Sequence, residues 1–366
     1  MPIDLPRLAT FFHWFAEREC DDEPLYQALC HVVADQPALL ELLAGAEREQ
    51  QRPNLWLAAV HDLLLSGATH PLQAYYASLG GTRAPDAALA GCLVDFVSQH
   101  REALRACMAT RTTQTNEIGR CAVLWPALQA IARRSGKPRL ALLDFGCSAG
   151  LNLGVDDYRY DTGDGVAAGD VGVPMLPCRL VGPLRPAPAD VQIVQRLGID
   201  PAPVNVNDEV AVRWLRACLW PSNVARITRF DQAIAIARQR AWPVRREADC
   251  TAAIAPWLAS LPTDVQPVLL NSWVLSYFEP AALQRHIHTV TALVREHGLM
   301  WLSAEGPELH IGPVVPPAPF EEGVQAQRGS LWTLCFRHGH EARFELLARS
   351  HPHGRWMEWL DAITAR

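Results

Sequence analysis

The sequence lacks several patterns that would assign it to a class at once. Its ten cysteines include no C-x-x-C pair, which argues against a zinc ribbon or a disulfide framework and favours a reducing compartment. No window holds about 18 apolar residues in succession, so no membrane-spanning helix is expected. The N-terminal stretch has no basic leader followed by an apolar core and a cleavage site, so we expect a cytoplasmic protein.

Charge and histidine spacing exclude two further classes. The net charge is −6 and there is no long basic run, so general nucleic-acid binding is not expected. The histidine pairs have no carboxylate or cysteine at a familiar spacing, so no metal site is predicted; these pairs are His286/His288, His338/His340 and His351/His353. The remaining expectation is a small-molecule partner.

The length and the apolar content predict two domains with a sizeable core. The chain has 366 residues, of which 49% are hydrophobic. Residues 1–112 show helical patterns only, such as the i, i+3, i+4, i+7 spacing of Leu8, Phe11, Phe12 and Phe15. We therefore expect an N-terminal all-helical domain over 1–112, packed as a cap over a second domain over 113–366.

The second part alternates strand and helix signals. Short apolar runs bounded by turn residues predict buried parallel strands, and the last two strands surround a His-Gly turn; these runs lie at 140–145, 191–200, 266–278, 299–305 and 331–351. The pattern is typical of an α/β fold with a mostly parallel, Rossmann-like sheet that is closed by a C-terminal antiparallel hairpin.

The stretch LLDFGCSAGLNLG supports two interpretations. GCSAG matches the G-x-S-x-G pattern of a hydrolase nucleophile elbow, with Ser148 as nucleophile, Asp249 or Asp264 as the acid, and His351 or His353 as the base. An elbow follows several earlier strands, and one of the earlier loops supplies an oxyanion-hole N–H. Here the glycine turn follows the first predicted strand, which weakens the serine hydrolase interpretation and leaves it open.

The second interpretation is a cofactor loop. Asp144 ends the strand, and Gly146 and Gly150 let the backbone turn tightly and approach a ligand. A helix is predicted to follow the loop and to present free N–H groups there. The stretch resembles the first motif of class I S-adenosylmethionine-dependent methyltransferases, an acid followed by G-x-G-x-G, with Ser148 in place of the middle glycine. A tight turn without any ligand is the other possibility.

Two acids further along the chain extend the cofactor interpretation. In such folds the second strand ends in an acid that accepts hydrogen bonds from the ribose diol, and Asp200 is the candidate. A third acid near the end of the next strand meets the adenine amino group, and Asp249 occupies that place. Each of them is equally well explained as an ordinary turn or cap acid.

Longer stretches resemble a bacterial family catalogued as domain of unknown function 2332. The resemblance covers nearly the whole chain and rests on QTNEIGR, DFGCSAGLNL with DDYRYD, VRWLRACLWP, VLLNSWVLSYF and HPHGRWMEW, in that order. It implies a Rossmann-like core that looks like class I methyltransferases. It implies no particular reaction.

Further candidates lie on both sides of the loop. Glu117 would accept from the ammonium of the cofactor, Arg120 would pair with its carboxylate, and Asn152 would reach the same carboxylate. For Glu117, local capping of the next helix is an equally good explanation. For Asn152, the alternative is a bond to backbone at the start of a helix.

Candidate catalytic residues stand at later strand ends, where α/β folds carry their chemistry. They are Asn271, Tyr277 and His353, and none of them is a clear general base. The leading hypothesis is an S-adenosylmethionine-dependent methyltransferase acting on a small molecule. The alternatives are a serine hydrolase that uses Ser148 and a non-catalytic nucleotide-binding protein of the same fold. The oligomeric state is not predicted.

Overall fold

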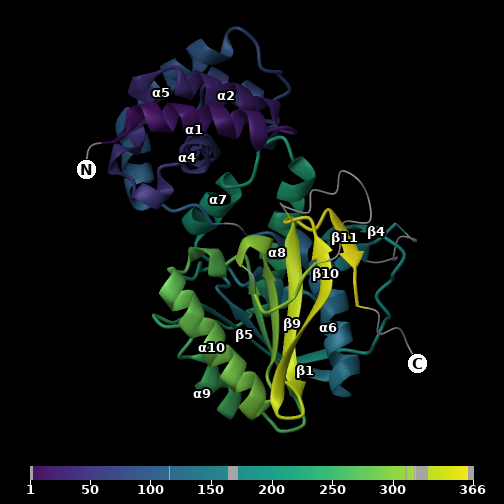
Figure 1. Cartoon of the computed structure of the whole chain (residues 1–366). Helices are drawn as coiled ribbons and strands as arrows, with labels where there is room; N and C mark the ends of the chain where they lie inside the picture. The colour runs from purple at the N-terminus through teal and green to yellow at the C-terminus, as the bar shows by residue number, and fades with distance from the viewer. Residues whose placement is uncertain are drawn as a thin grey trace. The chain divides into compact units, whose positions relative to one another are not determined.

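The computed structural model describes residues 3–114, 116–163, 172–309, 311–316, 318 and 329–361. Two compact units divide the chain (Figure 1). The helical unit consists of Met1–Thr115 and Asn207–Phe230, and the sheet unit consists of Asn116–Val206 and Asp231–Arg366. The helical unit therefore takes in a second segment, Asn207–Phe230, which the boundary drawn at residue 112 leaves in the other domain.

Proline marks the starts of several helices in the helical unit, because it fits the first helical turn, where its missing N–H costs nothing. The α-helices are α1 (Leu5–Arg18), α2 (Pro24–Ala34), α3 (Pro37–Leu40), α4 (Pro53–Leu65), α5 (Leu89–Thr110) and α7 (Glu209–Ala217). The short 3-10 helices are η1 (Glu41–Gly45), η2 (Arg48–Gln50), η3 (Pro71–Tyr75) and η4 (Ala77–Leu79).

The predicted apolar face of α1 is correct except at one position. Leu8, Phe12 and Phe15 are buried in the helical core. Phe11 is 36% exposed, and its ring stacks on Trp14 on the outside of the helix. The apolar stripe of α1 is therefore narrower than the sequence spacing suggests.

Side-chain hydrogen bonds hold α7 to the N-terminal helices. Trp214 Nε1 donates to the carbonyl of Thr112 at 2.9 Å, and Trp214 belongs to the same apolar core as α1 to α5. Arg213 Nε donates to Asp62 Oδ1 of α4 at 2.8 Å. These contacts explain why a segment between two strands of the sheet unit is part of the helical unit.

The sheet unit contains a nine-stranded sheet in the order β4-β11-β10-β9-β8-β7-β1-β5-β6 and a separate β2-β3 pair. The strands are β1 (Arg139–Phe145), β2 (Arg159–Asp161), β3 (Met175–Pro177), β4 (Arg179–Val181), β5 (Gln192–Asp200), β6 (Val244–Arg246), β7 (Gln266–Ser272), β8 (Met300–Glu305), β9 (Ser330–His338), β10 (Glu341–Ser350) and β11 (Trp356–Trp359). The helices are η5 (Ile118–Arg120), α6 (Cys121–Ser135), η6 (Leu151–Gly154), α8 (Val224–Arg240), which crosses the unit boundary, α9 (Ile254–Ala259), η7 (Leu275–Tyr277), α10 (Pro280–His297) and η8 (Pro307–Leu309).

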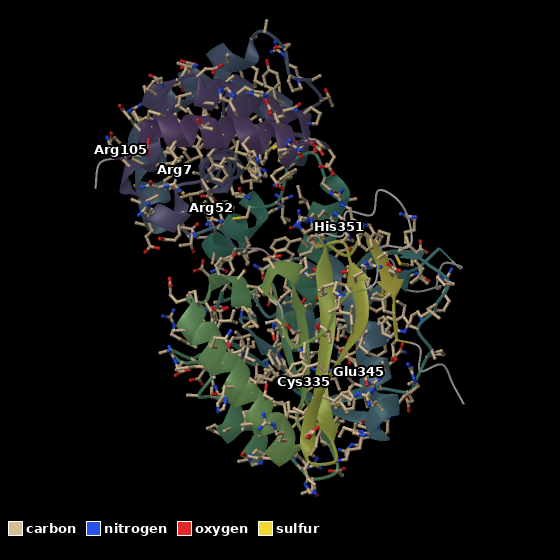
Figure 2. All side chains as sticks on the ribbon, viewed as in Figure 1. Arg7, Arg52, Arg105, Cys335, Glu345 and His351 are labelled. Carbon is tan, nitrogen blue, oxygen red and sulfur yellow. The ribbon has the colours of Figure 1, made fainter. Side chains whose placement is uncertain are left out.

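Five neighbouring strands, β6, β5, β1, β7 and β8, are parallel. The C-terminal strands β9 and β10 form an antiparallel hairpin, which is long and yellow in Figure 1. Cys335 and Glu345 lie on these two strands (Figure 2). The predicted α/β class, the mostly parallel sheet and the terminal hairpin are thus confirmed.

The central strand β1 is buried on both faces, and its side chains alternate between them. Ala141, Leu143 and Phe145 join the core formed with α9 and α10. Leu140, Leu142 and Asp144 therefore point to the opposite face, and Asp144 is the only charged member of the strand interior. Among the described residues, no helix is long and apolar enough to span a membrane.

Candidate functional site

The loop after β1 has an unusual backbone. Gly146, Ser148 and Gly150 have φ values of 72°, 51° and 69°, a region that glycine tolerates and that strains serine. A Cβ on Gly146 would lie 2.3 Å from Val274 Cγ2, and one on Gly150 would lie 2.6 Å from Val244 Cγ2. Both predicted glycines are therefore required by conformation and by packing.

Two polar side chains hold this loop in place. The Asp200 carboxylate at the end of β5 accepts from the Ser148 N–H at 2.9 Å and from the Ala202 N–H at 2.8 Å. Asn116 donates to Ser148 Oγ at 3.0 Å, and its own oxygen accepts from the Ala149 N–H at 3.2 Å. The loop conformation is thus fixed by a carboxylate from one side and an amide from the other.

Asp144 is a buried acid directly before the loop. Its side chain is 1% exposed, and its Oδ2 has no hydrogen-bond partner within the described part of the chain. Burial raises the pKa of Asp144 to about 7. A hydrogen bond from Asn152 and the positive charge of Arg120 act in the opposite direction and lower the pKa, while the negative charge of Asp200 raises it further. Asp144 is therefore poised to change its charge near neutral pH.

Arg120 is the cation of this cluster and is 5% exposed. Its Nη1 donates to the backbone oxygen and to Oγ of Ser272 at the end of β7, at 3.0 and 2.6 Å. Glu117 accepts from the Gly119 N–H at 2.8 Å and so caps η5. The structure brings Arg120 into electrostatic reach of Asp144 and gives Glu117 a local capping bond.

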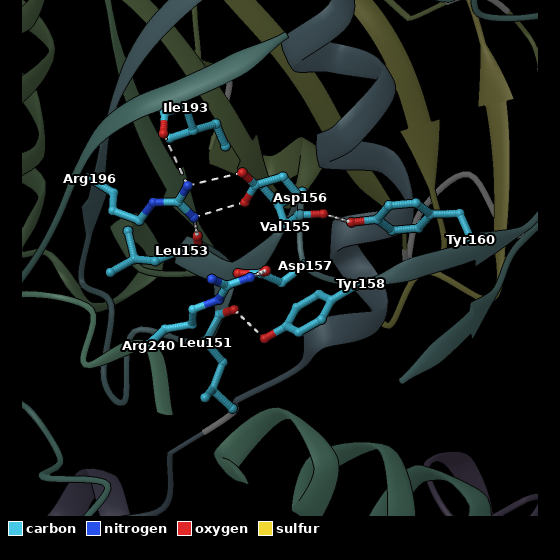
Figure 3. A network of polar contacts seen from close by, with 10 residues as sticks. All are labelled: Leu151, Leu153, Val155, Asp156, Asp157, Tyr158, Tyr160, Ile193, Arg196 and Arg240. Carbon is cyan, nitrogen blue, oxygen red and sulfur yellow. Dashed lines mark hydrogen bonds and ion pairs between the residues drawn. The ribbon is translucent and has the colours of Figure 1, made fainter. Parts of the chain in front are cut away.

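The helix predicted after the glycine loop is only the four-residue 3-10 helix η6 in the structure. In Figure 3, side chains from later segments donate to backbone carbonyls of this stretch. The Tyr158 hydroxyl donates to the Leu151 carbonyl at 2.7 Å. Arg196 Nη1 donates to the Leu153 carbonyl at 2.6 Å. The loop is therefore not followed by a helix N-terminus of useful length.

Two candidates lie on the surface of the sheet unit. Asp249, three residues after β6, is exposed, and its Oδ1 accepts from the Ala252 N–H at 3.0 Å, as a turn acid does. Tyr277 is 66% exposed on η7. Neither makes a described contact with the loop after β1.

Asn271 is 0% exposed, and its amide is used inside the protein. Its Nδ2 donates to Ser303 Oγ at 3.0 Å and to Glu305 Oε1 at 2.8 Å. Its oxygen accepts from Trp301 Nε1 at 2.5 Å. Asn271 therefore orients neighbouring side chains on β8 and presents no spare donor to a substrate.

His353 lies in the turn between β10 and β11, close to His351, which follows the end of β10 (Figure 2). The His353 N–H donates to His351 Nδ1 at 2.9 Å. The same turn packs backbone to backbone against η5: a Cβ on Gly119 would lie 2.3 Å from the His353 carbonyl oxygen, and one on Gly354 would lie 2.0 Å from the Gly119 oxygen. Two distant segments of the chain thus meet through paired glycines.

The family described as an uncharacterized protein conserved in bacteria (DUF2332) matches residues 9–359. The chain belongs to this family. No curated protein matches the chain.

The stretches that resemble the DUF2332 family have definite places in the structure. DFGCSAGLNL forms the end of β1, the glycine loop and η6, and VLLNSWVLSYF forms β7 and η7. QTNEIGR and HPHGRWMEW are the segments that meet at Gly119 and Gly354. VRWLRACLWP forms most of α7 and belongs to the helical unit. The family resemblance thus includes the segment that completes the helical core.

The Ser148 hydroxyl and the chain before β1 differ from the expected features of a nucleophile elbow. The Ser148 hydroxyl accepts a hydrogen bond from the amide of Asn116, a group that cannot remove its proton. Asp264 forms an ion pair with Arg139 at the start of β1, about 20 Å along the strand from its end. No strand precedes β1 within the described residues 3–114 and 116–138.

Two polar residues near the loop are not among the predicted ones. Asn116 fixes the Ser148 loop through both atoms of its amide. Glu305 ends β8 and is 1% exposed. The rule that selected Asp200 and Asn271, a polar residue at the end of a buried parallel strand, also selects Glu305.

Proposed function

We propose that this protein is an S-adenosylmethionine-dependent methyltransferase acting on a small molecule. The observation that carries the proposal is the buried Asp144 carboxyl, whose Oδ2 has no partner in the described chain, directly before the Gly146–Gly150 loop. A buried carboxyl without a partner costs free energy, and a ligand ammonium would offset that cost. The amino-acid end of adenosylmethionine carries such an ammonium.

The order of the strands supports a ligand at this place. Counted along the chain, the five parallel strands stand in the order 3-2-1-4-5, as β6-β5-β1-β7-β8. This is the order of the first five strands of a doubly wound, Rossmann-type sheet. Such sheets bind ligands at the carboxyl ends of the strands where the order reverses, which here is between β1 and β7. Asp144 and the loop lie at that point.

Asp200 supports binding of a ribose. A carboxylate has about four lone-pair positions. The backbone N–H groups of Ser148 and Ala202 occupy two of these positions on Asp200, one on each oxygen. The remaining positions suit the two hydroxyls of a ribose. The short η6 favours a cofactor without phosphates, because a dinucleotide needs a helix N-terminus for its pyrophosphate.

When bound, adenosylmethionine supplies an electrophilic methyl group. In the proposed arrangement Asp144 holds the ammonium, Asp200 holds the ribose, and Asp249 is assigned to the adenine amino group. Arg120 and Asn152 keep Asp144 ionised once the ammonium has arrived. The protein contributes mainly alignment and exclusion of water, which are the main requirements of methyl transfer. A cytoplasmic location is part of the same proposal.

Isothermal titration of the purified protein with S-adenosylmethionine, and with NAD for comparison, tests the proposal. We expect micromolar binding of adenosylmethionine and none of NAD. Asp144→Asn and Asp200→Asn should each weaken binding at least about tenfold, or about 1.4 kcal/mol, because each removes a charge from a ligand contact. Asp264→Asn is the matched control at the other end of β1 and should bind as the wild type does.

Two results would contradict this proposal. One is that the folded wild-type protein binds no adenosylmethionine. The other is that all three variants bind it equally well, because the carboxylates at the end of β1 and β5 would then make no contact with it. Asparagine is used instead of a larger residue because it preserves the size of the side chain. At position 200 it keeps one of the two bonds from backbone N–H groups, because its amide nitrogen cannot accept.

A further inference from the structure

A small cavity lies beside the end of β8. It has a volume of about 120 Å³ and is lined by two residues with polar side chains, Glu305 and Thr333, and by apolar residues. The apolar side chains come from the segment after β8 and from β9; they are Pro307, Ile311, Val314, Pro316 and Leu331. A single acid in a mostly apolar pocket is a feature that neither the family nor the proposed function accounts for.

Glu305 is held rigidly and is only half satisfied. Its Oε1 accepts three hydrogen bonds, from Asn271 Nδ2 at 2.8 Å and from the N–H groups of Val274 at 3.0 Å and Leu275 at 3.2 Å. Its Oε2 has no hydrogen-bond partner among the residues that the structure describes. The side chain is 1% exposed, so bulk water does not compensate for the missing bond.

Burial raises the pKa of Glu305. Its ionised form needs a hydrogen-bond donor at Oε2, and a cation is the best donor for a carboxylate. A divalent metal ion would need several further oxygen ligands, whereas Thr333 is the only other lining residue with a polar side chain. The cavity has room for a small organic group, since about 10 to 15 Å³ of such volume already admits one water molecule. We infer that this cavity, which we call the Glu305 pocket, binds a small primary alkylammonium group.

The Glu305 pocket lies on the opposite face of the sheet from Asp144, although the charge of Arg120 acts on both carboxyls. Phe145 pairs with Asn271, and Asn271 pairs with Ser303. Asn271, Ser303 and Glu305 therefore share the face of Phe145, while Asp144 points to the opposite face. Asp200 on β5 and Glu305 on β8 are three strand spacings apart, about 14 Å. The inference thus stands whether or not the protein binds adenosylmethionine.

The test uses propylammonium as the probe and 1-propanol as its uncharged counterpart of the same size. Both are titrated into the full-length protein labelled with nitrogen-15, and the amide signals of Val274 and Leu275 are followed. These two N–H groups bond to Glu305 and therefore report on its charge and position. We expect saturable shifts with propylammonium in the millimolar range and none with 1-propanol.

Three variants complete the design. Glu305→Gln keeps the size of the side chain and removes its charge, and should weaken propylammonium binding at least tenfold. Val314→Phe keeps Glu305 and fills the cavity from its loop side, and should have the same effect even if Glu305→Gln folds poorly. Glu308→Gln removes an exposed charge three residues away, and should leave binding unchanged.

The outcomes separate this inference from the proposed function. Equal shifts with 1-propanol and propylammonium, or unchanged binding in Glu305→Gln and Val314→Phe, would overturn the ammonium pocket. Adenosylmethionine is titrated into the same samples. Binding of propylammonium without adenosylmethionine supports the pocket and contradicts the methyltransferase proposal. Binding of adenosylmethionine without binding of propylammonium supports the methyltransferase proposal and contradicts the ammonium pocket.

Discussion

Replacing Asp144 by asparagine should make the stability of the protein less dependent on pH. Burial raises the pKa of the folded Asp144 to about 7 from a usual value of 3.8. Between these two values the folded state binds a proton that the unfolded state has lost. The free energy of unfolding of the wild type therefore falls as the pH rises through this window and levels off above it. The asparagine variant has no such proton.

The size of the effect follows from the width of the window. From pH 5 to about pH 7 the Asp144 carboxyl is ionised in the unfolded state and protonated in the folded state. The free energy of unfolding therefore falls by about 1.4 kcal/mol for each pH unit. Between pH 5 and pH 8 the wild type should lose about 2 to 3 kcal/mol relative to Asp144→Asn. Asparagine keeps an oxygen that can accept from Asn152, so the contribution of that bond largely cancels.

Urea unfolding of both proteins at pH 5 and pH 8 measures this difference. The difference in the free energy of unfolding between variant and wild type is compared at the two pH values. The contributions of all other titrating groups then cancel. Glu308→Gln, at an exposed position, controls for the loss of one negative charge. An equal stability difference at both values of pH would show that Asp144 ionises normally, and the argument for a ligand ammonium at this carboxyl would fail.

Two further predictions concern packing. Gly354→Ala should cost at least about 2 kcal/mol more than Gly339→Ala, because both glycines have positive φ but only the Cβ at Gly354 would meet a backbone oxygen, 2.0 Å away. Thermal unfolding of the pair tests this, and equal losses would contradict the tight contact. Arg196→Lys should cost about 1 to 2 kcal/mol, because Arg196 makes a bidentate pair with Asp156 at 2.8 and 2.9 Å. Arg240→Lys is the control, because this side chain is 58% exposed, and it should change stability by less than about 0.5 kcal/mol. Urea unfolding measures both variants, and similar losses would show that the bidentate pair of Arg196 adds no stability.

Much of the fold can be predicted from local pattern, because buried parallel strands are short apolar runs between turn residues. The runs that become β1, β7 and β8 follow this rule. β5 is largely exposed in its first half, and the hairpin is marked by its turn at Gly339. The strands β4 and β11 are three and four residues long and pair with partners far along the chain. Such pairing leaves no periodic signal in the sequence.

Part of the candidate site can likewise be predicted from the sequence, and part of it depends on tertiary contacts. Asp144, Gly146, Gly150 and Asp200 can be found from spacing alone, because the loop needs positive φ and the acids end predicted strands. The short length of η6 cannot be predicted in this way. Its carbonyls accept hydrogen bonds from the Tyr158 hydroxyl and from Arg196, which lie on later segments that fold back on it (Figure 3). The role of α7 in the helical unit depends likewise on tertiary contacts, which outweigh local propensity.

The two-segment helical unit has a consequence for synthesis of the chain. Its N-terminal segment ends at Thr115, but the core is completed only by Asn207–Phe230, which supplies Trp214. A nascent chain grows from the N-terminus, so the helical unit must wait, with part of its apolar surface uncovered, until this segment leaves the ribosome. By then β1 and β5 have also been made. The two units therefore mature together, and truncation after residue 115 should yield an incomplete core.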